Sequence, residues 1–203
     1  GTPLNPHFGG PKFTHLINRS TSLKNKIEDG SAVFGTISAF VTHYLTGNCL
    51  VDETVASRFI MMNLDTCEWD QNLLNLFGVP KICLPQLVPS EYNYGSIKYD
   101  EFLIPLQIVI GDQQAALIGQ GGFKTGSVAM NFGTSGSVQI NAGQQPAHID
   151  GLISSVLFSK ANERFYFLEG TVNACNALFY TLEDELDIPH KKMRWNHRCT
   201  KTE

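Results

Sequence analysis

Two groups of residues between positions 106 and 143 have the types and spacing needed for proton transfer and for phosphate binding. The first is Asp112, which follows the apolar run from Leu106 to Ile110. We predict that this run is a buried strand ending at Asp112, so that the carboxylate is held rigidly and can take a proton from a substrate hydroxyl. Gln113 offers both a hydrogen-bond donor and an acceptor, which suits a polyol.

The second group is the turn Gly133-Thr134-Ser135-Gly136, which we predict to connect the two strands of a hairpin. Gly133 and Gly136 permit positive φ angles and close approach of the backbone. Turns of this kind direct successive N–H groups outward and form an anion-binding nest. The hydroxyls of Thr134 and Ser135 add further donors. The turn is therefore a candidate phosphate-binding loop.

Each group also has a purely structural alternative. An aspartate after a strand often caps the next helix, so Asp112 could be the N-cap of a helix over residues 113–119. A turn with glycines is often only a hairpin connection. The two groups together favour the functional interpretation, because phosphoryl transfer depends on positioning and charge stabilisation, which a base and a phosphate cradle supply.

The motif G-D-Q-Q-A-A-L-I-G-Q-G at residues 111–121, followed by F-G-T-S-G at residues 132–136, resembles the FGGY carbohydrate kinases, the family of glycerol kinase and xylulokinase. The resemblance implies that Asp112 is the general base, that Gln113 contacts the substrate, and that the turn with Thr134 binds the phosphates of ATP. Mg²⁺ would accompany the nucleotide. Because Mg²⁺ keeps several waters, we expect few protein carboxylates around it and name no metal ligand in this chain.

The segment N-P-H-F-G-G-P-K-F-T-H-L-I at residues 5–17 also resembles the family. His7 stands where glycerol kinases carry a Tyr that contacts glycerol. We therefore predict that His7 contacts a different polyol, while a loop histidine without a role is the alternative. The resemblance further places Asn176 beside the nucleotide, at a position where glycerol kinases carry Gly. Core packing is the alternative for the helix that contains Asn176.

Hydrophobic periodicity and turn residues predict the surrounding elements. A helix begins near Phe13, and a second helix places Ala39, Phe40 and Tyr44 on one face and ends at Gly47. A third helix follows Trp69-Asp70 and ends at Gly78. We further predict a short hairpin or a loop over residues 94–105, strands over 151–158 and 163–168, and a helix over 173–186. Ser57 and Arg58 are interpreted as architectural, the first in helix packing and the second in an ion pair.

Composition limits the classes of partner. The net charge is −4, with Lys and Arg scattered along the chain, so neither nucleic acid nor an anionic membrane is expected as a partner. No apolar run is long enough to span a membrane, and residues 1–13 do not form a signal peptide. The five cysteines include no C-x-x-C pair, which favours reduced thiols in the cytoplasm and no zinc site. A homodimer is the one protein partner left open.

The resemblance implies an α/β fold of the ribonuclease-H-like (actin/hexokinase/Hsp70) type, present incompletely as parts of two domains. Residues 1–113 would be the C-terminal part of the substrate domain, and residues 114–203 the start of the nucleotide domain. A first phosphate loop of the D-x-G-T type and a later adenosine loop of the G-G-G/A type are not found in the sequence. We therefore expect an internal fragment that is inactive alone.

Three functional hypotheses follow. The first is ATP-dependent phosphorylation of a sugar or polyol. The second is an actin-like nucleotide-binding module with a structural or regulatory role, which would need the turn at residues 133–136 but not Asp112 or Gln113. The third is an inactive product that folds only with a further segment. The substrate stays open, because G-T-S-G is closer to pentose kinases and G-D-Q-Q-A-A is closer to glycerol kinase.

Overall fold

The computed structural model of the 203-residue chain describes residues 7–133, 135–173, 175 and 177–186. The chain divides into two compact units, each of which is described by itself. Unit 1 comprises Gly1–Ala129 and Gln139–Glu169, and unit 2 comprises Met130–Val138 and Gly170–Glu203. The predicted boundary near residue 113, between the two domains that the family resemblance implies, is a different division, and it stays a prediction.

The helices form where local end signals agree with apolar spacing. The α-helices are α1 (Gly9–Arg19), α2 (Thr21–Glu28), α3 (Ile37–Thr46), α4 (Glu53–Ala56), α5 (Gln71–Phe77), α6 (Asp112–Gly119) and α7 (Ala177–Glu185), and two 3₁₀ turns are η1 (Ser57–Phe59) and η2 (Lys81–Cys83). In α5 the carboxylate of Asp70 accepts hydrogen bonds from the N–H groups of Asn72 and Leu73, and Gly78 ends the helix at φ 62°. The predicted helix after Trp69-Asp70 is thereby confirmed.

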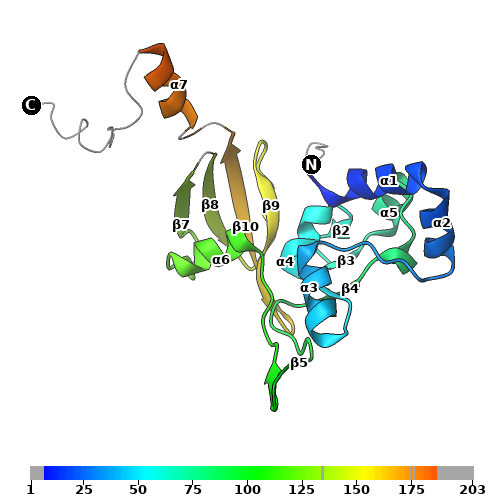
Figure 1. Cartoon of the computed structure of the whole chain (residues 1–203). Coiled ribbons are helices and arrows are strands. Elements are labelled where there is room, and N and C mark those ends of the chain that lie inside the picture. The colour runs from blue at the N-terminus through cyan, green and yellow to red at the C-terminus, as the bar shows by residue number, and fades with distance from the viewer. Residues whose placement is uncertain (1–6, 134, 174, 176, 187–203) are drawn as a thin grey trace, which may run out of the picture. The chain divides into compact units, whose positions relative to one another are not determined.

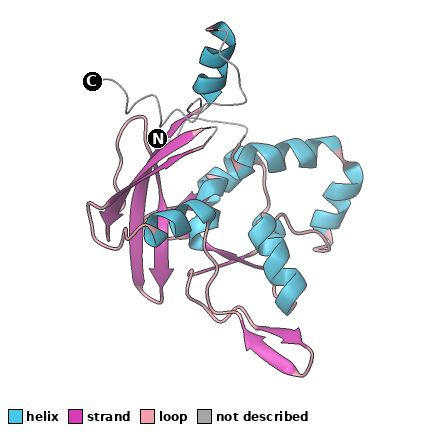
Figure 2. Ribbon diagram, turned by 60° about the vertical axis from the view of Figure 1, so that its left-hand side comes forward, coloured by secondary structure: helices cyan, strands magenta, loops and turns pink. Residues whose placement is uncertain are grey.

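The strands lie in short pairs and in one larger sheet. They are β1 (Leu50–Asp52), β2 (Met62–Asn63), β3 (Glu68–Trp69), β4 (Gln86–Val88), β5 (Ser96–Tyr99), β6 (Phe102–Pro105), β7 (Val128–Phe132), β8 (Gly136–Gly143), β9 (Ile153–Lys160) and β10 (Glu163–Val172). The larger sheet has the order β7-β8-β10-β9, and β1 pairs with β4 in parallel. The predicted hairpin over residues 94–105 is the antiparallel pair β5–β6, which projects from the rest of unit 1 (Figures 1 and 2).

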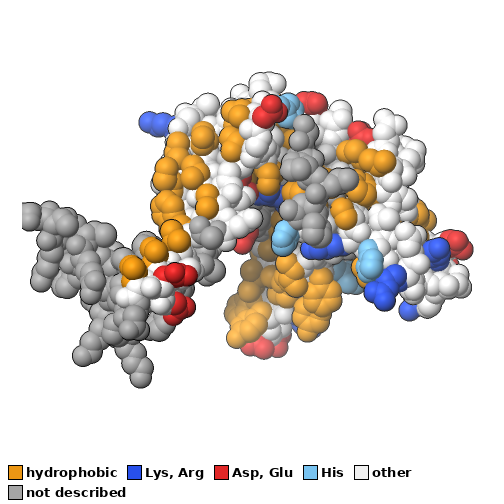
Figure 3. Space-filling model, turned by 90° about the horizontal axis from the view of Figure 1, so that it is seen from above, with side chains coloured by type: hydrophobic (Ala, Val, Ile, Leu, Met, Phe, Trp, Pro, Cys, Tyr) orange, Lys and Arg blue, Asp and Glu red, His pale blue; other side chains and the backbone are white. Residues whose placement is uncertain are grey.

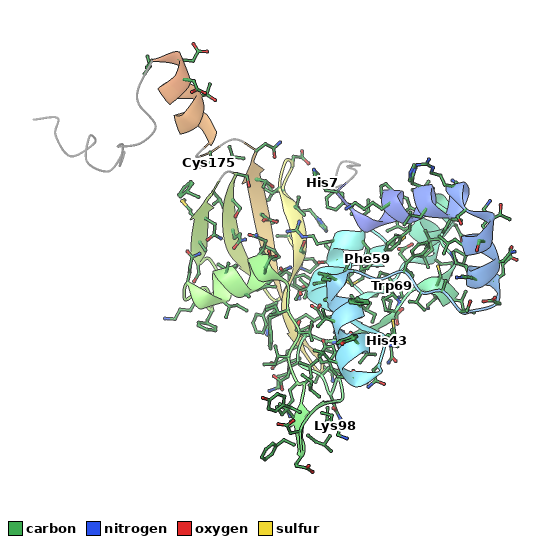
Figure 4. All side chains as sticks on the ribbon, viewed as in Figure 1. His7, His43, Phe59, Trp69, Lys98 and Cys175 are labelled. Atoms are coloured by element: carbon green, nitrogen blue, oxygen red, sulfur yellow. The ribbon has the colours of Figure 1, made fainter. Side chains whose placement is uncertain are left out.

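Aromatic side chains form the centre of the larger core of unit 1. Phe59 and Trp69, labelled in Figure 4, meet edge to face with ring centroids 5.3 Å apart. Phe13 of α1 stacks on Phe34 at 4.5 Å and contacts Phe59 at 5.3 Å. Leu74 of α5 is fully buried in the same cluster. This core joins α1 to the later segment that contains η1, β3 and α5.

A second, smaller core places α6 against the larger sheet. Leu117 of α6 is fully buried and packs with Ala129, Leu157 and Phe167, which come from β7, β9 and β10. Burial of this kind stabilises by roughly 1.5–3 kcal/mol for each large apolar side chain. The helix that begins at Asp112 is therefore fixed to the sheet through its apolar side.

The predicted apolar face of α3 divides between the core and the surface. Ala39 and Thr42 are buried, whereas Phe40 and Tyr44 are 62% and 79% exposed and stack on each other at 6.3 Å. The expectation that Phe40 and Tyr44 share the environment of Ala39 is therefore wrong, because the helix packs through its smaller side chains.

On the face drawn in Figure 3, hydrophobic side chains gather in patches, and Lys and Arg side chains lie in several separate places.

Candidate active site

Asp112 is the first residue of α6 and is exposed. Gly111 is the N-cap, with φ −64° and ψ 150°, and Oδ1 of Asp112 accepts a hydrogen bond of 2.8 Å from the N–H of Gln113. A carboxylate in the first turn of a helix is stabilised by the partial positive charge of the helix N-terminus. Gly111 and not Asp112 occupies the N-cap position, but the carboxylate of Asp112 still accepts an N–H of the first turn, so a structural role at the helix start stays an alternative to the role of a base. The carboxylate is placed where a substrate hydroxyl could reach it.

The segment before Asp112 differs from the predicted buried strand. Residues 106–111 belong to no strand in the described part of the chain, and Ile108, which is 54% exposed, forms only an isolated bridge with Glu91. The N–H of Val109 donates to the carbonyl of Ser90 at 3.1 Å. The sequence run is apolar enough for a strand, but strand pairing is non-local, and these hydrogen bonds go to the loop around residues 90–95 instead.

Gln113 is half-buried and its amide is oriented by a second glutamine. Nε2 of Gln139 donates to Oε1 of Gln113 at 2.7 Å, and Gln139 is fully buried on β8. Sequence reasoning missed Gln139. A signal was present, because Ser137, Gln139 and Asn141 put polar side chains at alternate positions of a strand where apolar ones would be expected to face a core.

The candidate phosphate loop joins β7 to β8 within unit 2, as predicted for a hairpin. Thr134 lies outside the described residues. The N–H of Gly133 donates to the carbonyl of Ser135 at 2.8 Å, so this N–H points into the turn. Neither Gly133 nor Gly136 has a positive φ angle. A Cβ at Gly136 would lie 3.4 Å from both Cβ and Sγ of Cys175, which is close to an ordinary van der Waals contact.

The remaining predicted site residues are peripheral or undescribed. His7 is exposed just before α1, and its carbonyl accepts a hydrogen bond from Nζ of Lys12 at 3.1 Å (Figure 4). Asn176 lies outside the described residues. Ser135 is exposed in the turn. The structure brings Asp112 and Gln113 together on α6; the roles of all these residues stay predictions.

Two ion pairs join β10 to α4 and to η1. Arg164 of β10 contacts both carboxylate oxygens of Glu53 in α4, at 2.8 and 2.9 Å. Arg58 of η1 pairs with Glu169 of β10. The predicted ion pair of Arg58 is confirmed, and its partner could not be named from sequence because the two residues are 111 positions apart.

Across the described ranges, no group of three or more His, Cys, Asp or Glu side chains could hold a metal ion. Mg²⁺ keeps several waters and is usually bound through one or two carboxylates plus substrate phosphates. In the same ranges, no helix is long and apolar enough to cross a membrane.

Comparisons with known proteins give the family. The sequence profile described as "FGGY family of carbohydrate kinases, N-terminal domain" matches residues 1–119. The glycerol kinase of Acidiphilium cryptum is 36% identical over 200 residues, which cover 93% of this chain and 39% of the relative. The glycerol kinase of Thermococcus gammatolerans is 34% identical over 200 residues, which cover 97% of this chain and 40% of the relative. The chain therefore spans less than half the length of these relatives.

Solved structures of related kinases have the same fold as this chain. The structure of Plasmodium falciparum glycerol kinase with ADP matches with a TM-score of 0.86 at 31% identity, over 91% of this chain and 38% of that one. The structure of xylulose kinase from Rhodospirillum rubrum matches with a TM-score of 0.79 at 16% identity, over 92% of this chain and 38% of that one. At this identity the match supports the fold alone. The predicted ribonuclease-H-like α/β fold, present in part, is confirmed. Because the profile match covers more than half of the chain, the chain belongs to the FGGY family of carbohydrate kinases.

Proposed function

We propose that the full-length product of this gene transfers the γ-phosphoryl group of ATP to a hydroxyl of a sugar or polyol, with Asp112 as the general base. The observation that carries the proposal is the exposed carboxylate of Asp112 at the N-terminus of α6, in a chain of the FGGY family. Gln113 beside it presents an amide whose orientation is fixed by Gln139. A base and a neighbouring amide on one rigid helix form a binding point for a polyhydroxylated substrate.

The proposed reaction is an in-line displacement. Asp112 takes the proton from the acceptor hydroxyl, the oxygen forms a bond to the γ-phosphorus, and the bond to the β–γ bridging oxygen breaks, so that ADP leaves. Mg²⁺ supplies charge neutralisation on the phosphates when it is bound with the nucleotide. The turn of residues 133–136, with Thr134 and Ser135, is proposed to contact the nucleotide phosphates, and Asn176 to lie near the nucleotide.

The acceptor is proposed to be a polyol, and His7 to contact it. Curated relatives of this chain are glycerol kinases, but His7 replaces the Tyr that the resemblance places at this position, which favours an acceptor other than glycerol. The protein is proposed to act in the cytoplasm, without nucleic acid or membrane as a partner, and as a monomer or homodimer. The 203-residue chain is proposed to be inactive by itself.

The test is turnover of the full-length gene product with ATP and Mg²⁺ against glycerol, xylulose, ribulose, gluconate and erythritol. Release of ADP that depends on one acceptor is expected. Asp112→Asn should lower that turnover by roughly 10²–10⁴-fold, since a positioned general base contributes on that scale. The affinity for ATP should be unchanged, because Asp112 acts on the acceptor hydroxyl.

The matched control is Asp150→Asn, which removes an equally exposed carboxylate from a loop. It should turn over like the wild type. Near-normal turnover of Asp112→Asn would remove the base assignment. Tight binding of ATP without turnover of any acceptor would instead favour an actin-like nucleotide-binding module with a structural or regulatory role.

A further inference from the structure

The start of α6 is held by a residue 57 positions earlier, Thr54 of α4. Oγ1 of Thr54 accepts a hydrogen bond of 2.9 Å from the N–H of Gly111, and the carbonyl of Thr54 accepts one of 3.3 Å from Nε2 of Gln114. Thr54 is fully buried. Its two contacts lie on either side of Asp112 and Gln113, which are themselves exposed and half-buried.

Thr54 is in turn fixed by Asp52, the last residue of β1. Oδ2 of Asp52 accepts hydrogen bonds from the hydroxyl of Thr54, from the N–H of Thr54 at 2.9 Å and from the N–H of Val55 at 3.3 Å. A hydroxyl has a single hydrogen. Because that hydrogen is donated to Asp52, a lone pair of Oγ1 is directed to Gly111. The strand β1 is thus connected through two side chains to the first residue before the candidate base.

Gln114 anchors the same turn of α6 from the other side. Its Nε2 also donates to the carbonyl of Val156 on β9, at 3.2 Å, and the residue is 3% exposed. A Cβ at Gly111 would lie 2.4 Å from Oε1 of Gln114. Glycine at position 111 is therefore explained by the close approach of the Gln114 side chain to the backbone at Gly111.

Other contacts of α6 do not replace this arrangement. Leu117 fixes the helix against the sheet, but it lies more than one turn after Asp112. Gly111, as N-cap, has no side chain with which to satisfy the N–H groups of the first turn. Thr54 instead accepts from the N–H of Gly111 itself, the backbone group that an N3 Glu or Gln side chain satisfies in a capping box.

We infer that Thr54, held by Asp52, is a positioning residue that fixes the backbone at Gly111 and thereby the carboxylate of Asp112 for proton transfer. The inference rests on the proposed function, in which Asp112 is the base. Positioning residues buried behind a reacting group commonly set its geometry, and a displacement of about 1 Å can cost on the order of 10²-fold in rate.

The test compares Thr54→Val and Thr54→Ser in the full-length gene product. Valine keeps the shape and removes the hydroxyl, so kcat should fall by roughly 10–10²-fold while the KM for ATP stays within about twofold. Serine keeps the hydroxyl and should restore kcat to within about threefold of the wild type. Wild-type kcat in Thr54→Val, or equal impairment in both variants, would overturn the inference.

Thr42→Val is the matched control for stability. Thr42 is also buried, and its hydroxyl donates to the carbonyls of Ala39 and Leu50 at 3.0 and 2.8 Å, but it has no contact with α6. It should lower the melting temperature about as much as Thr54→Val and leave kcat unchanged. A comparable loss of kcat in Thr42→Val would assign the effect to general destabilisation and overturn the inference.

Hydrogen exchange separates this inference from the proposed function. If the wild-type protein phosphorylates no acceptor, the proposed function fails, and the structural part is still decided by the backbone amides of residues 111–116. Their exchange should accelerate roughly tenfold in Thr54→Val and not in Thr42→Val, as expected for loss of one hydrogen bond at the helix start. Unchanged exchange in Thr54→Val would overturn the positioning role even in an active enzyme.

Discussion

Arg164 contacts both carboxylate oxygens of Glu53, with Nη2–Oε1 at 2.8 Å and Nε–Oε2 at 2.9 Å. Glu53 is 2% exposed, so the guanidinium is the charge partner that allows a carboxylate to be buried there. The pair ties α4 to β10. Since Thr54 follows Glu53 directly, the same pair also fixes the helix that holds the start of α6.

We expect Arg164→Ala to lower the free energy of unfolding by about 3 kcal/mol, because it leaves a buried carboxylate without its partner. Urea denaturation followed by circular dichroism measures the change. Lys160→Ala is the control, since Lys160 and Glu91 form an exposed pair at 3.1 Å that should contribute less than about 1 kcal/mol. Equal losses in the two variants would show that burial does not decide the strength of these pairs.

Burial raises the pKa of Asp52 from 3.8 to about 6, although hydrogen bonds from Thr54 and Val55 act in the opposite direction. A folded-state pKa above the unfolded one means that the folded protein binds more protons in this window. Asp52 therefore contributes stability that is fully present below about pH 4 and is lost as the pH rises through about 6. A two-unit shift corresponds to roughly 3 kcal/mol.

The measurement is the difference in unfolding free energy between wild type and Asp52→Asn from pH 4 to pH 7. The unfolding free energy of the wild type minus that of Asp52→Asn should fall as the pH rises, because only the wild type titrates at this site. Asp70→Asn is a control of opposite sign: backbone hydrogen bonding from Leu73 lowers the pKa of Asp70, so its contribution is present at high pH and is lost on acidification. A flat difference for Asp52→Asn would contradict the raised pKa.

Gly111→Ala should destabilise the protein by about 1–3 kcal/mol, because the new methyl group would lie 2.4 Å from Oε1 of Gln114. In the background of Gln114→Ala the same substitution should cost less, which a double-mutant cycle measures as a coupling energy. Gly119→Ala is the control in the same helix. Nothing lies within 4 Å of its Cβ position, so that change should be neutral or slightly stabilising. Absence of coupling would contradict the close-packing explanation of Gly111.

Elements with local signals could be predicted from the sequence. Helix α5 has its cap at Asp70 and its end at Gly78, α3 ends at Gly47 with φ 78°, and the hairpins β5–β6 and β9–β10 follow turn residues. Each of these signals lies within a few positions of the element that it determines. Local cap and turn signals were sufficient to place them.

Features that depend on distant partners could not be predicted. The run before Asp112 has the composition of a strand, but its hydrogen bonds go to the loop near Ser90, and no local pattern indicates that. The contact between Thr54 and Gly111 joins positions 57 apart. Likewise the candidate base Asp112 was recognisable from its motif, whereas Gln139, which donates a hydrogen bond to the neighbouring Gln113, carries no motif of its own.

Gln139→Leu tests whether that partner of Gln113 matters for the acceptor. Nε2 of Gln139 donates to Oε1 of Gln113 at 2.7 Å, while Oε1 of Gln139 is buried and has no hydrogen-bond partner in the described part of the chain. Removing a partly unsatisfied buried amide should change stability by less than about 1 kcal/mol. Loss of the hydrogen bond from Gln139 to Gln113 should raise the KM for the acceptor roughly three- to tenfold, with the KM for ATP unchanged.

Asn141→Leu is the control for this prediction, because Asn141 occupies the next inward position of β8. Its amide donates to the carbonyl of Gly122 at 2.8 Å and accepts from the N–H of Gly143 at 2.9 Å, without a contact to Gln113. It should cost about 2 kcal/mol of stability and leave the acceptor KM unchanged. If Asn141→Leu raises the acceptor KM as much as Gln139→Leu, the effect belongs to the packing of β8, and the glutamine pair has no specific role in substrate binding.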